Sequence, residues 1–381
     1  MAKVLRYGMV GGGPGAFIGD VHRKAAAFDG LAVLVAGAFS TSFDRTKQTG
    51  EELGLDESRL YKDYTEMAQQ EAKRDDGIDF VSIVTPNNTH YPIAKAFLEQ
   101  GIHVICDKPL TTSLKDAEEL QKLARDKGLL FGVTYTYTGY PMVKHARHMI
   151  QNGEIGEIRF VNAEYAQDWL ATPMEKEGLK QAEWRTDPKQ TGIANSVGDI
   201  GTHVENMVSY LTGLKIKRLS ARLDSFVEGR TLDDNATVMV EYDTGAKGLY
   251  WVSQIAIGGD NALRVRVYGT KAAVEFVQED PDHLKVSILG GPDKILSRGR
   301  DDLAENAAKY PRVPAGHPEG FFEAFSNIYK TFAEGVMEAK SGKKVTDDDF
   351  DYIGVAGGVD GVRFIEKCVE SSKAGAKWLD V

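Results

Sequence analysis

The chain is poor in cysteine and carries no excess of positive charge. Cys106 and Cys368 are its only cysteines, too few for a disulfide framework or for a zinc site built from cysteines. Lys and Arg total 46 against 56 Asp and Glu, a formal net charge of −10 with no long basic run. We therefore expect no nucleic-acid partner and no attraction to anionic membranes.

Long apolar runs are also absent. The longest one, residues 31–39, has about half of the ~20 residues that a membrane span requires. The N-terminus passes directly into an apolar segment at residues 4–10, which leaves no room for a secretory leader. With so few cysteines, these features predict a cytoplasmic protein that does not contact the membrane.

Proline is scarce, at 12 residues, whereas glycine is abundant at 40. This glycine content exceeds the usual ~7% without a collagen period, so tight turns or close backbone approaches to a ligand are expected. The composition is otherwise ordinary, with 42% hydrophobic and 27% charged residues. A length of 381 residues suits two domains of roughly 150 residues or more.

The first 135 residues alternate between short β-branched runs and segments with helical spacing. The runs lie at residues 4–10, 32–39, 80–85, 103–106 and 130–135. Helical spacing occurs between them, for example at 92–99 and 114–127. Strands that are apolar on both faces and separated by helices indicate a parallel sheet covered on both sides. Residues 1–136 are therefore predicted to form a doubly wound α/β domain.

Beyond Tyr140 the pattern changes to longer strands joined by turns. Strands are predicted at residues 158–165, 218–226, 236–242, 248–257, 263–268 and 284–289, and helices at 142–151, 200–211, 319–339 and 352–371. Asp243-Thr244-Gly245 is a hairpin signal. Residues 137–381 are therefore predicted to form an α+β domain with a large, mainly antiparallel sheet. Apolar residues on both faces of 249–257 suggest that helices cover one face and a partner subunit or an internal loop the other.

A glycine-rich loop follows the first predicted strand. Gly11-Gly12-Gly13-Pro14-Gly15-Ala16 matches the G-x-G-x-x-G/A pattern, with Ala16 in the third position. In this pattern the first glycine permits a turn, the second lets backbone approach a pyrophosphate, and the small third residue allows close packing of helix and strand. A plain flexible turn is the alternative. Because the loop occupies the first β–α turn of a doubly wound pattern, we favour dinucleotide binding.

The end of the second predicted strand bears on the choice between NAD and NADP. An acidic residue usually stands there and binds the ribose of NAD. Here Ser40 directly follows the strand, with Asp44 and Arg45 just beyond it. Ser40 and Arg45 could hold a 2′-phosphate, whereas Ser40 or Asp44 could meet a free ribose. The single nearby cation favours NAD and leaves NADP possible.

A lysine follows the fourth predicted strand. Cys106-Asp107-Lys108-Pro109 lies at the carboxyl end of that strand, where ligands gather in open α/β sheets. Lys108 could donate to a substrate oxygen. The alternative is a solvated surface lysine, which is the usual environment of this residue type.

A carboxylate and an imidazole stand four residues apart in the second domain. Asp199 and His203 open a predicted helix, and this spacing places both on one helical face. A carboxylate orients an imidazole and favours its protonated form, which suits general acid/base catalysis. The alternatives are a helix N-terminal charge, a satisfied buried histidine, or a metal pair. No further ligand motif accompanies a metal pair, so we expect no metal.

These motifs, with Thr85-Pro86-Asn87 and His90 after the third predicted strand, together resemble the Gfo/Idh/MocA oxidoreductase family over essentially the whole chain. The resemblance implies an N-terminal Rossmann domain and a C-terminal domain whose open sheet commonly forms the interface of a dimer or tetramer. It also implies that Lys108, Asp199 and His203 form the catalytic group. The family's usual Glu-Lys-Pro is Asp-Lys-Pro here, which leaves the lysine in place.

The resemblance also implies which residues contact the ligands. The expected cofactor contacts are Gly11, Gly13, Pro14, Gly15, Ala16, Phe17, Ile18, Ser40, Arg45, Thr85, Pro86, Asn87, His90, Asp107 and Lys108. Substrate contacts are expected from polar and aromatic residues that could surround a polyol, although each could equally be packing. They are Lys108, Tyr135, Tyr137, Asp168, Trp169, Trp184, Arg185, Asn195, Asp199, His203 and His317.

The leading hypothesis is an NAD(P)-dependent dehydrogenase that oxidises a secondary hydroxyl of a sugar, anhydrosugar, glycoside or cyclitol, with ring C3 as one possible position. Under this hypothesis, His203 removes the hydroxyl proton, Asp199 orients the imidazole and Lys108 stabilises the alkoxide. Similarity to the family leaves two alternatives: an NAD-dependent glycosidase that uses transient oxidation, and a dinucleotide-binding sensor without enzymatic activity. Retention of all three catalytic residues argues against the sensor.

Overall fold

The computed structural model describes residues 4–381, apart from the side chain of residue 180. The chain divides into two compact units. The first contains the N-terminal part up to Thr136 together with Phe322–Val359, and the second contains Tyr137–Phe321 together with Asp360–Val381. The chain therefore leaves the first unit, builds most of the second, returns to the first, and ends in the second.

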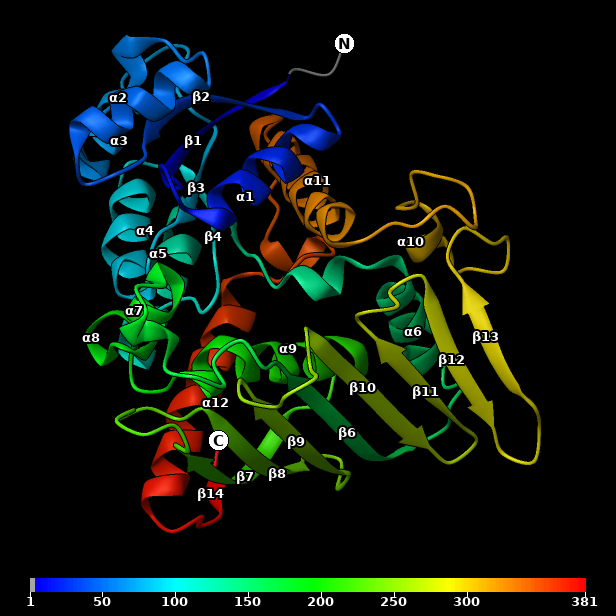
Figure 1. Ribbon diagram of the computed structural model, residues 1–381. Coiled ribbons are helices and arrows are strands. Elements are labelled where there is room, and N and C mark those ends of the chain that lie inside the picture. The colour runs from blue at the N-terminus through cyan, green and yellow to red at the C-terminus, as the bar shows by residue number, and fades with distance from the viewer. Residues whose placement is uncertain (1–3) are drawn as a thin grey trace. The chain divides into compact units, whose positions relative to one another are not determined.

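The first unit is built on a parallel sheet of five strands (Figure 1). The strands are β1 (Leu5–Gly11), β2 (Ala32–Ala38), β3 (Phe80–Val84), β4 (His103–Cys106) and β5 (Phe131–Val133), in the spatial order β2-β1-β3-β4-β5. The order reverses between β1 and β3, and ligands of such sheets bind beyond the carboxyl ends of the strands at this point. The predicted doubly wound α/β architecture is confirmed.

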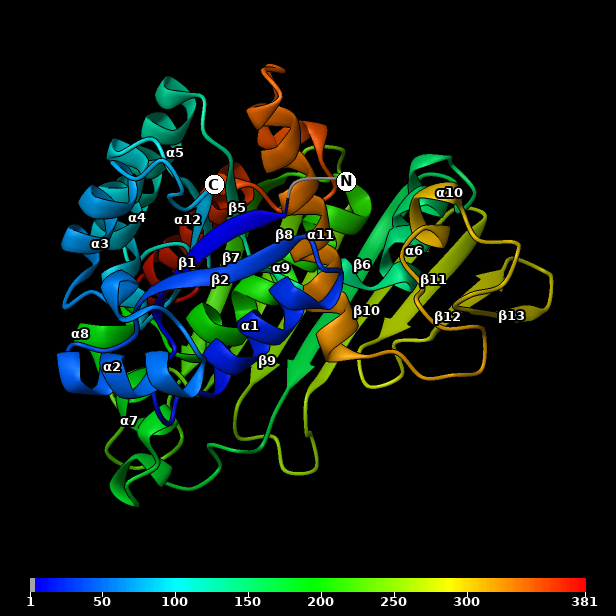
Figure 2. The same cartoon turned by 90° about the horizontal axis from the view of Figure 1, so that it is seen from above.

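Helices cover both sides of this sheet. In Figure 2, α3 (Tyr64–Glu71), α4 (His90–Glu99) and α5 (Leu114–Lys127) lie on one side, and α1 (Phe17–Phe28) and α11 (Phe321–Lys340) lie on the other. A further helix, α2 (Phe43–Glu52), follows β2. Buried strands such as β3, with no exposed residue, need this cover on both faces.

Helix α11 joins the first unit through a buried polar contact. The Tyr329 hydroxyl lies 2.7 Å from the Ser82 hydroxyl of β3 and 2.7 Å from Nδ1 of His22 on α1. Further along the chain, the Asp347 carboxylate accepts a hydrogen bond of 2.9 Å from the backbone N–H of Phe131 in β5. The returning segment therefore bonds to both a central strand and the edge strand of the sheet.

The second unit is built on a sheet of nine strands, β13-β12-β11-β10-β6-β9-β8-β7-β14. All neighbours are antiparallel except β6 and β9, so the predicted mainly antiparallel sheet is confirmed. The strands are β6 (Ile158–Ala166), β7 (Ile216–Asp224), β8 (Asn235–Tyr242), β9 (Lys247–Ser253), β10 (Ala262–Gly269), β11 (Ala272–Val277), β12 (His283–Ile288), β13 (Asp293–Ser297) and β14 (Leu379–Asp380). Strands β11, β13 and β14 were not predicted from the sequence.

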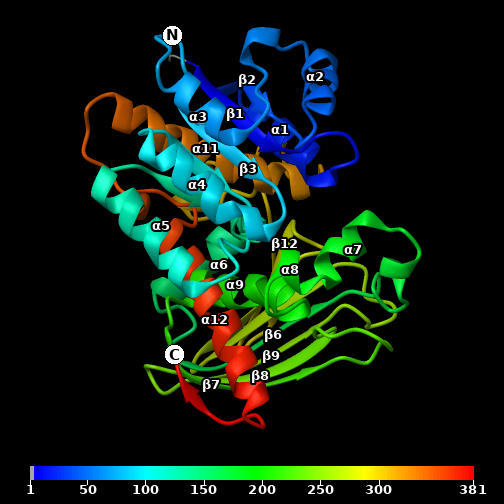
Figure 3. The same ribbon diagram turned by 90° about the vertical axis from the view of Figure 1, so that its left-hand side faces the viewer.

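The two faces of this sheet differ. Helices α6 (Pro141–Gln151) and α9 (Thr202–Thr212) lie on one face (Figures 1 and 3). The opposite face displays Phe160, Met239 and Tyr268, which are 39%, 47% and 41% exposed. The remaining helices of this unit are the short α7 (Lys180–Thr186), α8 (Pro188–Thr191) and α10 (Glu305–Ala308), while α12 (Val355–Lys373) is shared by the two units.

No helix within residues 4–381 combines the length and the apolar content that a membrane crossing demands.

Helix α9 buries a carboxyl group, Glu205, which is only 7% exposed. Burial raises the pKa of Glu205 from 4.5 to about 8, the charge of Asp360 raises it further, and Lys215 opposes the shift. Between these two pH values the folded protein retains a proton that the unfolded chain releases. The stability therefore falls as the pH rises through this window.

We expect Glu205→Gln to remove this pH dependence because glutamine has no proton to release. Relative to the variant, the wild type should lose up to about 1.4 kcal/mol of unfolding free energy for each pH unit within the window. Urea denaturation at several pH values measures the difference. Glu51→Gln, at an exposed position, should keep the wild-type slope. If the unfolding free energies of wild type and Glu205→Gln change equally with pH, the expectation is contradicted.

Candidate active site

The glycine loop after β1 has a backbone that side chains would obstruct. Gly11, Gly12 and Gly15 have φ angles of +87°, +74° and +80°, in the region that favours glycine. The Gly13 N–H donates a hydrogen bond of 3.2 Å to the carbonyl oxygen of Phe39, and a Cβ on Gly13 would lie 2.7 Å from that oxygen. The loop therefore requires glycine for its conformation and for its close packing against the residue that follows β2.

Helix α1 begins directly after this loop, with Ala16 as its N-cap. The closest approach of helix and loop is made by Gly19, because a Cβ there would lie 2.4 Å from the Cα of Gly12. Arg23 of the same helix donates a hydrogen bond of 2.9 Å to the Gly12 carbonyl oxygen. The unbonded N–H groups of the first helical turn suit a pyrophosphate. Ala16 was predicted from the sequence as the small residue of this contact, whereas Gly19 was not.

A pocket of about 440 Å³ opens beside the loop. It is lined by loop residues 12–17 and by side chains of α1 and α2, including Asp20, Arg23 and Thr49. Ser40, Thr85 and Lys108 do not line it, so it borders the loop from the side of these helices.

The contact between Gly19 and Gly12 predicts the effect of one added methyl group. Gly19→Ala would force α1 away from the loop, because both colliding atoms belong to the backbone. Such overpacking typically costs about 1–3 kcal/mol, and we expect the affinity for NAD⁺ to fall about tenfold or more. Calorimetric titration with NAD⁺ measures it.

Gly54→Ala is the matched control for Gly19→Ala. Gly54 has a φ of +66°, but no atom lies within 4 Å of the added Cβ. This variant should therefore lose stability without losing affinity for NAD⁺. Unchanged affinity in Gly19→Ala would show that the close contact does not shape the binding loop.

The residues after β2 border the same loop. Arg45 donates a hydrogen bond of 2.8 Å from Nη2 to the Pro14 carbonyl oxygen, so this exposed guanidinium bridges α2 and the glycine loop. The Ser40 hydroxyl accepts a hydrogen bond of 3.2 Å from the Ser42 N–H. Both residues lie where the sequence predicted a ribose or phosphate contact, and no carboxylate takes the place of Ser40.

The segment after β3 is fixed by His90. Thr85 and Pro86 lead into a 3₁₀ turn over Asn87–Thr89, and α4 begins at His90. The two ring nitrogens of the buried His90 lie 2.8 Å from the Thr85 carbonyl oxygen and 2.9 Å from that of Pro109. His90 therefore connects the loop after β3 to the loop that carries Lys108, with its ring engaged by backbone.

Lys108 lies half-buried beyond the carboxyl end of β4. Its backbone N–H donates a hydrogen bond of 2.8 Å to Oδ1 of Asp107, which also accepts one of 3.1 Å from the Thr134 hydroxyl. The Lys108–Pro109 peptide is cis. Asp107 thus holds the backbone at Lys108, and Thr134 is a supporting residue that the sequence did not reveal. Tyr135 follows β5 and is buried.

In the second unit, Asp199 lies in a π-helical turn, Val197–Gly201, that leads into α9. Single π turns are frequent at functional sites. The buried Asp233 fixes the start of this turn, because its carboxylate accepts hydrogen bonds of 2.7 and 2.8 Å from the backbone N–H groups of Asn195 and Val197. Burial raises the pKa of Asp233 to about 6. The spacing of Asp199 and His203 had predicted an ordinary helical turn here.

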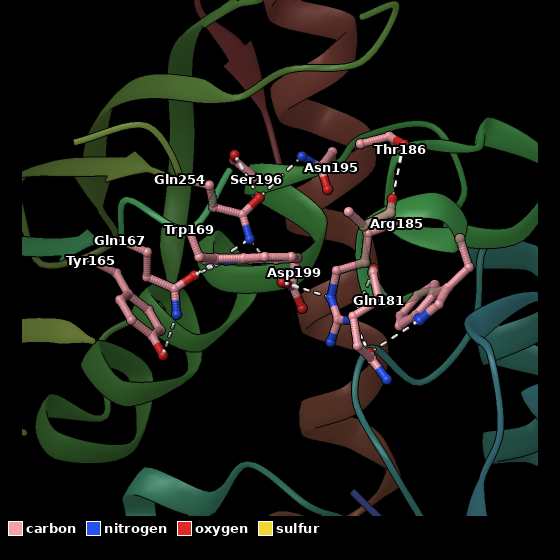
Figure 4. A network of polar contacts seen from close by, with 12 residues as sticks. Tyr165, Gln167, Trp169, Gln181, Arg185, Thr186, Asn195, Ser196, Asp199 and Gln254 are labelled. Atoms are coloured by element: carbon pink, nitrogen blue, oxygen red, sulfur yellow. Dashed lines mark hydrogen bonds and ion pairs between the residues drawn. The ribbon is translucent and has the colours of Figure 1, made fainter. Parts of the chain in front are cut away.

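The Asp199 carboxylate accepts hydrogen bonds from two side chains (Figure 4). Arg185 Nε lies 3.2 Å and Gln254 Nε2 lies 2.9 Å from Oδ2. The Arg185 guanidinium packs on Trp184, 4.2 Å from its ring centroid, and lies 5.7 Å from that of Trp169. Arg185, a candidate from the sequence, therefore pairs with the carboxylate, and the candidates Trp169 and Trp184 lie against its guanidinium.

Amides extend this network away from Asp199. Gln254 Oε1 accepts hydrogen bonds of 3.0 Å from both Asn195 Nδ2 and the Ser196 hydroxyl. Its Nε2 also lies 3.4 Å from Gln167 Oε1, which accepts a bond of 3.0 Å from Trp169 Nε1. These contacts leave little rotational freedom to the groups around the carboxylate.

His203 lies on α9 among aromatic residues. Its ring centroid is 4.7 Å from that of Tyr137 and 6.1 Å from that of Tyr165. The two phenol oxygens are 2.5 Å apart, and Tyr165 also donates a hydrogen bond of 2.5 Å to Asn261 Oδ1. Burial raises the pKa of both phenols, so both remain neutral donors. Gln167 Nε2 bonds to Asn261 at 2.9 Å and so connects this cluster to the Asp199 network.

Two other candidates have different surroundings. Asp168 accepts a hydrogen bond of 3.1 Å from the Gly258 N–H. His317 is exposed on a loop whose backbone is held by Arg298. This buried arginine donates to the carbonyl oxygens of His317 and Val313 and forms ion pairs with Asp282 and Glu319. The roles of Asp168 and His317 as substrate contacts therefore stay predictions.

Several side chains of the site were missed in the sequence, namely Tyr165, Gln167, Asp233, Gln254 and Asn261. Gln167 and Gln254 do carry a faint signal, because each is a polar residue just after an apolar strand, β6 or β9. Within residues 4–381, no three His, Cys, Asp or Glu side chains are grouped so that they could hold a metal ion.

Comparison with known proteins decides the family. Residues 5–135 match the model of the oxidoreductase family with an NAD-binding Rossmann fold, and residues 143–275 match that of the GFO/IDH/MocA C-terminal domain. The chain belongs to the Gfo/Idh/MocA oxidoreductase family. It is therefore an oxidoreductase with an NAD-binding Rossmann domain.

Relatives of this Gfo/Idh/MocA protein match it along its whole length. An uncharacterized oxidoreductase of Bacillus subtilis, YfiI, is 39% identical over 100% of this chain and 98% of its own. The levoglucosan dehydrogenase of Pseudarthrobacter phenanthrenivorans is 27% identical over 99% and 98%. Among solved structures, an inositol dehydrogenase homolog from Azotobacter vinelandii, complexed with NADH and myo-inositol, is 40% identical over 100% and 98%, with a TM-score of 0.95.

Proposed function

We propose that this family member oxidises a secondary hydroxyl of a cyclitol, anhydrosugar, sugar or glycoside, with a ring position such as C3 as the site of reaction. The observation that carries the proposal is the group of donors, acceptors and aromatic rings around Asp199 and His203. A polyhydroxylated ligand needs many fixed polar partners, and this network supplies amides, phenols, a guanidinium and a carboxylate. Similar proteins have been solved in complex with myo-inositol and with levoglucosan.

The chain's own residues divide the chemical work. Bound NAD⁺ supplies a nicotinamide that accepts hydride. His203 removes the proton of the substrate hydroxyl, Asp199 orients the catalytic groups while Arg185 and Gln254 hold its carboxylate, and Lys108 donates to the developing alkoxide.

The glycine loop fits this cofactor, because Gly11, Gly12 and Gly15 adopt φ angles that favour glycine and α1 begins directly after the loop, where the N–H groups of its first turn suit a pyrophosphate. We propose that the loop, with Phe17, Ile18, Ser40 and Arg45, binds NAD in preference to NADP. Arg45 is engaged with the Pro14 carbonyl oxygen, which reduces its availability for a 2′-phosphate.

Isotope transfer tests the proposed reaction. With myo-inositol or levoglucosan deuterated at the ring carbons, the enzyme should transfer deuterium to NAD⁺ and accumulate deuterated NADH. Cleavage of a glycoside without net formation of NADH would instead establish an NAD-dependent glycosidase that oxidises its substrate transiently. Dinucleotide binding without transfer from any sugar or cyclitol would overturn the proposed dehydrogenase.

We also propose that the helix-free face of the nine-stranded sheet forms a homo-oligomer, a dimer or tetramer. Phe160 and Tyr268 pair across β6 and β10 on that face, and Met239 is exposed on β8. Phe160→Glu places a charge in this interface and should lower the mass measured by light scattering, whereas the exposed Phe226→Glu outside the strands should not. A monomeric wild type at micromolar concentration would contradict this proposal.

A further inference from the structure

The second unit contains a pocket that the proposed reaction does not use. Its volume is about 410 Å³, within the roughly 300–1,000 Å³ typical of small-molecule sites. It is bordered by α6, the start of β11, strands β12 and β13, and the chain just before α10. No residue of the Asp199 network lines it, and neither does His203.

The floor of this pocket is aliphatic. Met149, Val286 and Leu303 line it and are buried, and Leu296 is half-buried beside them. No Phe, Tyr or Trp contributes to the lining. The floor therefore suits an alkyl group and offers no ring on which a flat ligand could stack.

One buried polar group faces this floor. His145 on α6 is only 6% exposed, and its Nδ1 accepts a hydrogen bond of 3.1 Å from the Ala304 N–H. Burial lowers the pKa of His145, so the ring is neutral near pH 7 and its proton lies on Nε2. Nothing in the described part of the chain accepts a hydrogen bond from Nε2, and the ring lines the pocket. A fixed donor is thus available to a ligand.

Charges of both signs stand at the rim. Lys271 and Lys294 carry positive charge, and Glu154 and Asp302 carry negative charge. All four side chains are exposed, and none is within ion-pair distance of an opposite charge in residues 4–381. The two carboxylates are close enough to His145 to act on its ring. The rim as a whole is neutral and can pair with both charges of one ligand.

We propose that this pocket binds a small aliphatic zwitterion, an α-amino acid with an apolar side chain. Its carboxylate pairs with Lys271 and Lys294 and accepts from His145 Nε2. Its ammonium group pairs with Glu154 and Asp302, and its alkyl group packs on Met149 and Val286. A ligand of single charge would leave two like rim charges without a partner.

Calorimetric titration of the full chain with L-leucine, L-valine and L-methionine tests this. We expect saturable binding of at least one of them. For the amino acid that binds, the analogue lacking the amino group and the analogue lacking the carboxylate should each bind about tenfold more weakly or worse, because each loses charge-assisted hydrogen bonds. For leucine these analogues are 4-methylpentanoate and 3-methylbutylamine. No binding of any of the three amino acids up to about 10 mM, or equal binding of both analogues, overturns the proposal.

Variants locate the site. Lys271→Met with Lys294→Met, and separately Glu154→Gln with Asp302→Asn, should each weaken binding about tenfold or more. His145→Asn keeps an acceptor for the Ala304 N–H and removes the Nε2 donor. If His145→Asn does not fold, the variants at the exposed rim still show whether the amino acid binds in this pocket. Lys217→Met, at an exposed position outside the pocket, is the control. If binding is unchanged in every rim variant, the amino acid binds elsewhere and the assignment of this pocket is overturned. This outcome does not depend on whether the protein has dehydrogenase activity.

Discussion

The variant His203→Asn is expected to lose about 10²–10⁴-fold in kcat, the usual contribution of a positioned acid or base. Asparagine keeps polarity in the aromatic surroundings of Tyr137 and Tyr165 but cannot take up the hydroxyl proton. The affinity for NAD⁺ should be unchanged, because the glycine loop and its supporting residues belong to the first unit. Steady-state kinetics with NAD⁺ titration measures both quantities.

The pH profile separates a catalytic role of His203 from a structural one. The wild type should lose activity at low pH as the imidazole becomes protonated, whereas the residual activity of His203→Asn should lack this limb. His148→Asn, at a half-buried position of α6 that does not contact the Asp199 network, should retain the wild-type profile. A His203→Asn enzyme with full kcat would exclude His203 as the base.

The second large effect is expected from Lys108→Met, which should lower kcat by about 10²–10³, the range found when one donor to a developing oxyanion is removed. Methionine keeps the length of the stem and removes the ammonium group. Asp107 would still bond to the backbone at position 108 and to Thr134, so the loop should keep its conformation. The melting temperature should therefore change little.

Controls separate charge from position at Lys108. Lys108→Arg retains a donor of different shape and should recover only part of kcat. Lys115→Met, at an exposed position of α5, should leave kcat unchanged. Weakened NAD⁺ binding with normal kcat in Lys108→Met would assign the lysine to the cofactor instead of the reaction.

The first unit was the easier part to predict from the sequence. Its strands are continuous apolar runs interrupted by helices, and the glycine loop marks the first turn. The return of Phe322–Val359 to this unit could not be predicted. It depends on contacts between residues far apart in the sequence, such as Tyr329 with Ser82, which local periodicity does not record.

In the second unit, the predicted strands were those with many apolar residues. The unassigned β13 is mostly exposed, so it lacks an alternating apolar pattern. In the same way, Asp199 and His203 were found because they share one short motif. Gln167, Gln254 and Asn261 come from separate strand ends, and only the folded sheet joins them into one network.

The most direct test of the proposed function is nicotinamide absorbance with the wild-type enzyme, with NAD⁺ and NADP⁺ in separate assays. The substrates are inositols, free hexoses, levoglucosan, and alkyl or aryl glucosides at mildly alkaline pH. We predict reduction of NAD⁺ by one subset of these polyols, with a lower kcat/KM for NADP⁺. If no substrate of the panel reduces either cofactor, while calorimetry shows that NAD⁺ binds, the assignment of this chain as a sugar or cyclitol dehydrogenase is contradicted.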